Sequence, residues 1–120
     1  VDISDTTEDN PFMVQPGDFL LAETMEIFNL PEDVSAQFVL KSSRARAGFN
    51  HMLAGWCDPG WHGSTLTLEL KNERQHHPLP IFPGMKIGQM VFHSMSNVPF
   101  VSYAKTGHYN NHLTVMPSVA

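Results

Sequence analysis

Short apolar runs separated by turn residues make up most of this sequence, and alternation with period two dominates over helical spacing from Phe12 onward. The segment STLTLEL, residues 64–70, places leucines on one face and threonines and a glutamate on the other, which predicts a half-buried strand. MKIGQMVF, residues 85–92, predicts a second strand. Many short strands at close spacing indicate a sandwich, jelly roll or barrel.

Three Pro-Gly pairs mark the turns between these runs: Pro16-Gly17, Pro59-Gly60 and Pro83-Gly84. Each predicts a type II turn, because proline presets the first central φ and glycine accepts the positive second one. One short helical turn is expected from Ser43 to Ala47, where SSRARAG offers a serine N-cap and a terminating glycine. We expect a flexible, acidic N-terminal arm over residues 1–11 and a single β domain over residues 12–120.

Composition and charge narrow the possible functions. The chain has 120 residues, a formal net charge of -5 and one cysteine, Cys57. This charge argues against binding of long nucleic acids, and one cysteine excludes both an intrachain disulfide and a multi-cysteine zinc site. The sequence also contains no bilayer-length apolar run and no signal-peptide pattern, so we expect a cytoplasmic protein without membrane contact.

Three groups of residues could carry chemistry, and each has a simpler structural explanation. The run from Lys41 to Arg46 could bind phosphate oxygens with its serines, lysine and backbone amides, or be a capped, solvated basic turn. Asp58 could act on a substrate or simply cap the turn that follows it. Glu69 could be solvated, or it could move protons if its strand face lines a pocket, where desolvation raises its proton affinity.

The histidines do not predict a metal site. None of the seven has a recognised ligand spacing. The sequence also lacks the H-x-E and P-C-x-x-C motifs with which zinc deaminases hold their metal. We therefore expect no zinc and no metal ligand among these side chains.

Four separated segments carry a family resemblance: PGDFLLAETMEIFNLPEDV, KSSRARAG, AGWCDPGWHGSTLTLEL and PGMKIGQMVF. Their order and spacing resemble the dCTP deaminase family and its bifunctional dCTP deaminase/dUTPase relatives, over roughly residues 14–118. The resemblance implies a distorted β jelly roll that assembles as a homotrimer, with active sites where subunits meet. Relatives also carry a DLRLG-like segment before the PGDF-like strand, and this sequence does not contain it.

The resemblance also implies roles for individual residues. Lys41, Ser42 and Ser43 match the phosphate-binding motif, and Arg46 matches an arginine that supports the catalytic site, where Ser42 would help to position the water. Glu69 matches the catalytic glutamate. Three further residues would bind substrate from a C-terminal closing tail, about residues 103–120, that folds over a neighbouring site: Tyr103, Tyr109 and His112.

Asp58 matches an aspartate that holds the deoxyribose 3′-hydroxyl and, in pyrophosphatases of the family, helps to activate water. His108 and His112 replace a lysine and a glutamine common in relatives, so phosphate affinity is expected to fall as histidine loses its charge.

The implied function is zinc-independent deamination of dCTP to dUTP and ammonia, which supplies dUMP for thymidylate synthesis, with magnesium bound through the triphosphate. Two alternatives remain within the same superfamily: a bifunctional enzyme that releases dUMP and pyrophosphate, and a dUTPase alone. A non-catalytic, nucleotide-binding regulatory trimer is the alternative from another class.

Overall fold

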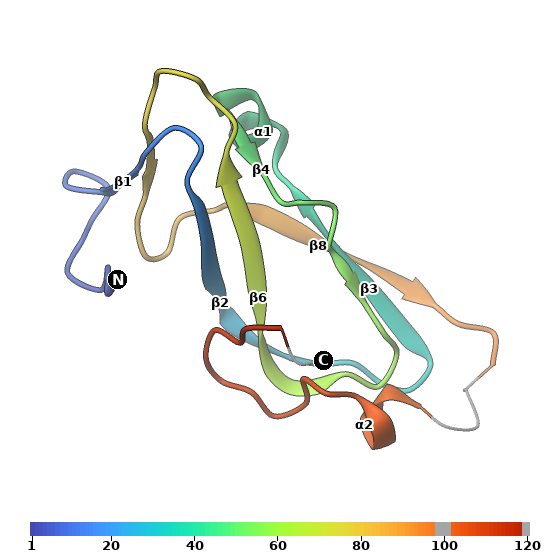
Figure 1. Ribbon diagram of the computed structural model, residues 1–120. Coiled ribbons are helices and arrows are strands. Elements are labelled where there is room, and N and C mark those ends of the chain that lie inside the picture. The colour runs from blue at the N-terminus through green and yellow to red at the C-terminus, as the bar shows by residue number, and fades with distance from the viewer. Residues whose placement is uncertain (98–101, 119–120) are drawn as a thin grey trace.

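The computed structural model describes residues 1–97 and 102–118, and most of its regular structure is β-strand (Figure 1). The elements in chain order are β1 (Phe12–Val14), β2 (Phe19–Asn29), β3 (Val34–Leu40), α1 (Ser42–Ala47), β4 (Phe49–Asn50), β5 (Trp56–Cys57), β6 (His62–Asn72), β7 (Leu79–Ile81), β8 (Gly88–Ser94) and α2 (Tyr103–Thr106). This composition confirms the all-β fold class. The expectation of a single helical turn was wrong, because α2 is a second one, too short for sequence periodicity to mark.

The strands form three antiparallel sheets, ordered β1-β7, β2-β6-β4 and β5-β3-β8. The long strand β6 is the centre of its sheet, with β2 on one edge and β4 on the other (Figure 1). The pairing of β2 with β6 shifts register between Glu23 and Ile27. Such an irregularity bends a strand, which suits a distorted jelly roll.

Two buried clusters hold the sheets together. In the larger one, Leu68 and Leu70 of β6 pack with Phe38 of β3 and with apolar residues of β1, β4 and β7. The smaller cluster contains Leu30, Ala36, Cys57 and Trp61. It anchors the Asp58–Gly60 turn, because the residues on both sides of this turn are buried.

The turn chemistry is confirmed at all three Pro-Gly pairs, since φ is +80° at Gly17, +87° at Gly60 and +82° at Gly84. The start expected for the second strand was wrong: β8 begins at Gly88, three positions after Met85. The N–H of Met85 still bonds to the carbonyl of Phe82 within the preceding turn (3.2 Å).

The ends of α1 differ in how well they were predicted. Gly48 terminates the helix with φ +126°, as expected. The expected serine N-cap was wrong, because Lys41 takes this position and no side chain of the described residues caps the helix. Both serines therefore lie inside the first turn.

At the N-terminus, Ile3 packs against the larger core. The division into a flexible arm over residues 1–11 and a domain over residues 12–120 stays a prediction. No helix within residues 1–97 and 102–118 is long and apolar enough to cross a bilayer.

Candidate active site

A cavity of about 540 Å³ lies along β6, which is a size typical of small-molecule sites. Its walls come from β2, from residues 54–61, from β6 and from the C-terminal segment, residues 103–118, which is also called the tail below. Five of the residues that the sequence marked for function line it together: Asp58, Glu69, Tyr103, Tyr109 and His112.

Glu69 faces this cavity because its neighbours on β6 face the core. Leu68 and Leu70 are 2% and 0% exposed, so strand alternation directs the side chain between them to the opposite face. Only 31% of the Glu69 side chain is exposed, and among the described residues its buried Oε2 atom has no hydrogen-bond partner. Burial raises the pKa of this carboxyl above its ordinary value, which suits a group that takes up and returns a proton.

His51 contacts Glu69, and the sequence did not single it out. Its Nε2 atom lies 3.4 Å from Oε2 of Glu69, and its ring packs on Phe38 with centroids 4.5 Å apart. Burial lowers the pKa of His51, so this histidine is neutral near pH 7. The only signal in the sequence is that Asn50 and His51 are the two polar residues of an otherwise apolar stretch, FNHMLAG, and that His51 has no metal-ligand spacing.

Asp58 lies at the cavity wall on the Pro59-Gly60 turn, and the N–H of Trp61 bonds to its carbonyl (3.2 Å). Asp58 is exposed, so its carboxylate can reach a ligand. The adjacent Cys57 is buried, and this burial raises the pKa of its thiol to about 12. A thiol that keeps its proton is a poor nucleophile and a poor metal ligand.

The C-terminal segment closes one end of the cavity. Tyr103 belongs to α2, and its hydroxyl accepts a hydrogen bond from the N–H of Tyr109 (3.2 Å). The rings of Tyr109 and His112 meet edge to face, 6.1 Å apart. All three residues line the cavity of their own chain. The expectation that this tail covers a neighbouring site stays a prediction.

The phosphate-binding candidates lie elsewhere in the chain. Lys41, Ser42, Ser43 and Arg46 lie in or beside α1, and all four are exposed. None of them lines the cavity. Figure 1 shows α1 near one end of β6 and α2 with the C-terminal segment near the other. Within one chain, the structure therefore brings Glu69 together with Asp58 and the tail, and it does not bring them together with α1.

Other cavity residues were visible in the sequence only as a pattern. Thr65 and Thr67 line the cavity because they share the strand face of Glu69. Trp56 and Trp61 line it too, and nothing in their spacing predicted this. Within the described part of the chain, no three histidine, cysteine, aspartate or glutamate side chains gather as a metal site would require.

Comparison with known proteins identifies relatives for most of the chain. A family model described as dCTP deaminase-like matches residues 1–95. A protein of Leifsonia xyli named "dCTP deaminase, dUMP-forming" is 47% identical over 90 residues, which are 74% of this chain and 44% of that protein. Proteins with the same name from Mycobacterium marinum and Rhodococcus opacus are 39% and 38% identical, over 88% and 94% of this chain.

The chain covers 55% and 61% of those last two proteins, so it spans about half the length of the curated relatives it matches. Among solved structures, a 2′-deoxycytidine 5′-triphosphate deaminase from Agrobacterium tumefaciens aligns with a TM-score of 0.64 at 23% identity. The alignment covers 75% of this chain and 28% of that one. At this identity the likeness supports the fold.

Proposed function

Because this chain belongs to the dCTP deaminase-like family, we propose that it deaminates dCTP and carries the product on to dUMP. The balanced reaction consumes two waters and releases ammonia and pyrophosphate. One observation carries the proposal: Glu69 and Asp58, the two carboxylates to which the resemblance gives chemical roles, line the same cavity. Relatives named as dUMP-forming support the second step.

In the first step, Glu69 is proposed to act as base and then as acid. It takes one proton from the water that attacks C4 of the cytosine ring and delivers it to N3 of the ring. It then takes the proton of the new C4 hydroxyl and delivers it to the amine, which leaves as ammonia while the C4 carbonyl forms. Its raised pKa supports this role, because a carboxylate with a raised pKa is a stronger base toward water and keeps the proton until it is delivered in the second half of the cycle. Thr65 and Thr67 line the same wall of the cavity.

In the second step, Asp58 is proposed to hold the deoxyribose 3′-hydroxyl and to help activate the water that cleaves dUTP. Its exposed position at a turn supports this role, because a mobile ligand can approach it from solvent. Without this step the product would be dUTP, as in a deaminase alone.

The triphosphate is proposed to bind between subunits of a homotrimer. α1 presents Lys41, Ser42 and Ser43 to solvent, and neither serine hydroxyl has a hydrogen-bond partner among residues 1–97 and 102–118. These donors and Arg46 would therefore serve the cavity of a neighbouring copy. Large exposed apolar side chains support such an assembly, among them Phe19, Met25, Ile27 and Phe92.

Magnesium is proposed to arrive with the triphosphate as part of the substrate, because hard cations prefer phosphate oxygens. The deamination itself is proposed to proceed without zinc. The donor chemistry supports this proposal, since the single cysteine has a pKa of about 12 and the sequence lacks the zinc deaminase motifs.

A product assay tests the proposed function. The purified chain is incubated with dCTP or with dUTP in the presence of magnesium, and the nucleotides are separated by chromatography. We expect dUMP from both substrates. Accumulation of dUTP from dCTP would indicate a deaminase alone, and dUMP from dUTP only would indicate a dUTPase. Bound but unchanged nucleotide would refute catalysis.

A further inference from the structure

The C-terminal segment makes an extensive set of hydrogen bonds to β6 of its own chain. The N–H of Asn111 donates to the carbonyl of His62 (2.8 Å), and the N–H of Thr65 donates to the carbonyl of His112 (2.9 Å). The N–H of Met116 donates to the hydroxyl of Thr67 (3.1 Å). The segment therefore follows β6 over several residues, and backbone atoms supply many of the contacts.

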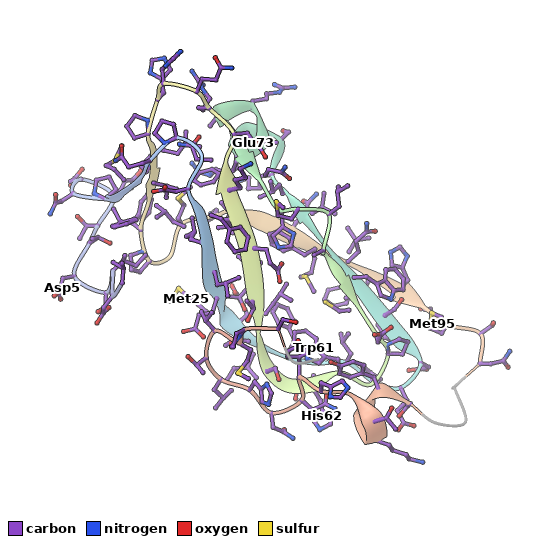
Figure 2. The ribbon with its side chains drawn as sticks, in the orientation of Figure 1. Asp5, Met25, Trp61, His62, Glu73 and Met95 are labelled. Atoms are coloured by element: carbon purple, nitrogen blue, oxygen red, sulfur yellow. The ribbon has the colours of Figure 1, made fainter. Side chains whose placement is uncertain are left out.

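Ser64 lies at the middle of this contact and is 1% exposed. Its hydroxyl donates to the carbonyl of Tyr109 (2.5 Å) and accepts from the N–H of His112 (2.8 Å). One buried side chain thus bonds to the backbone of two tail residues that line the cavity, Tyr109 and His112. The carbonyl of Tyr109 accepts a further hydrogen bond from the indole of Trp61 (2.9 Å), which Figure 2 shows beside the C-terminal segment.

The shape of β6 and its turn is adapted to the same contact. A Cβ atom at Gly63 would lie 2.1 Å from the side-chain oxygen of Asn111, and φ of this glycine is +69°. A Cβ atom at Gly60 would lie 2.9 Å from the backbone nitrogen of Ala104. Two glycines thus leave the space in which α2 and the tail lie.

We infer that Ser64 is a positioning residue that fixes Tyr109 and His112 in the cavity wall before a nucleotide arrives. It does not touch the reacting atoms, and it acts through the two residues that it holds. The C-terminal segment is then a preformed wall instead of a flap that the nucleotide must order. Substrate binding does not have to supply the ordering free energy of this segment, because folding has already supplied it.

The first test is hydrogen exchange on the nucleotide-free chain, which requires no catalytic activity. We expect protected amides over residues 109–116 and exchange about tenfold faster in Ser64→Ala, since its hydrogen bonds to the tail are lost. Ser35→Ala is the matched control: Ser35 is 0% exposed, and within the described part of the chain its hydroxyl hydrogen-bonds only to the sulfur of Met95 (3.5 Å). It should leave exchange over residues 109–116 unchanged.

Trp61→Phe provides an independent variant in case Ser64→Ala fails to fold. It removes the hydrogen bond to Tyr109 and keeps an aromatic ring stacked on Phe28, whose centroid lies 5.7 Å away. Exchange over residues 109–116 should again accelerate. Unprotected amides in this stretch of the unsubstituted chain would overturn the inference, as would exchange in Ser64→Ala that equals that of the unsubstituted chain.

The second test rests on the proposed function and separates positioning from folding. Ser64→Ala should raise KM for dCTP about tenfold and leave kcat nearly unchanged, because the lost contacts hold substrate and transition state alike. Ser35→Ala should change neither. If the unsubstituted chain has no activity, the proposed function fails while the exchange result still decides the role of Ser64.

Discussion

Replacing Glu69 with glutamine is the most direct test of the proposed chemistry. Glutamine keeps the shape of the side chain and its contact with His51, and it removes the ability to accept a proton from water. Loss of a general base costs about 10²- to 10⁴-fold in rate, which corresponds to about 3 to 5 kcal/mol in the barrier.

The structure places the expected loss at the upper end of this range. His51 contacts Glu69 but does not line the cavity, and its pKa is lowered by burial. It therefore cannot reach a substrate in place of the glutamate. Folding should be unaffected or slightly improved, because Glu69→Gln removes the charge of a carboxylate whose buried Oε2 atom has no hydrogen-bond partner in the described part of the chain.

The assay measures kcat for dCTP, dCTP binding by calorimetry and the midpoint of thermal unfolding. Glu73→Gln is the control: it makes the same chemical change just beyond β6, at the opposite end of this strand from Trp61 (Figure 2). Glu73 accepts a hydrogen bond from Asn50 (3.1 Å) and does not line the cavity. Glu69→Gln should bind dCTP and fail to turn it over. Turnover within tenfold of the unsubstituted chain would refute the role of Glu69.

Four further predictions follow from the proposed function and the structure. Asp58→Asn should lower dUMP formation about 100-fold while dUTP accumulates from dCTP, as product chromatography would reveal; equal loss of both products would contradict separate roles for the two carboxylates. Because burial raises the pKa of Glu69, the acidic limb of the kcat profile should lie above the range of an ordinary glutamate, and kcat should increase as pH rises through that limb; a limb at the ordinary value of 4.5 would contradict this. Burial lowers the pKa of His51 in the folded state. The contribution of neutral His51 to the free energy of unfolding is therefore fully present above pH 6.5, the ordinary pKa of histidine, and is lost as the pH falls through the lower pKa of the folded state. Urea unfolding at several pH values would measure this loss. Inactive Glu69→Gln and Ser42→Ala chains should recover activity when they are refolded together, because a mixed oligomer can combine an intact Glu69 of one chain with an intact α1 of its neighbour. No recovery of activity in mixed oligomers would argue against a site shared between subunits.

Local patterns predicted the strand that contains Glu69 and the orientation of this catalytic candidate. Alternation over residues 64–70 indicated that Glu69 shares a face with Thr65 and Thr67, and this face lines the cavity. Turn chemistry was equally local, since proline and glycine fix φ without help from distant residues. The family resemblance supplied the roles of these residues, which alternation alone left open between solvated and catalytic.

Contacts between distant segments could not be predicted from the sequence. His51 contacts Glu69 because β4 pairs with β6 in a register that sets Asn50 opposite Lys71. The register between two strands this far apart in the chain cannot be predicted from the local pattern of one sequence. The hydrogen bond from Ser64 to Tyr109 of the tail also joins segments that are distant in the sequence, so the position of the tail could not be predicted either. The serine N-cap of α1 failed for a local reason, because Lys41 occupies the cap without a side-chain bond.

The central strand β6 links the stability of this chain to its proposed activity. Leu68 and Leu70 fill the core, the residues between and before them face the cavity, and Ser64 holds the tail. A slip of one residue in the pairing of β2 with β6 would turn the leucines toward the cavity and Glu69 toward the core. The cost of exposing two leucines and burying a carboxylate opposes this slip. The same apolar burial that stabilises the sheet therefore keeps the catalytic candidate facing its substrate.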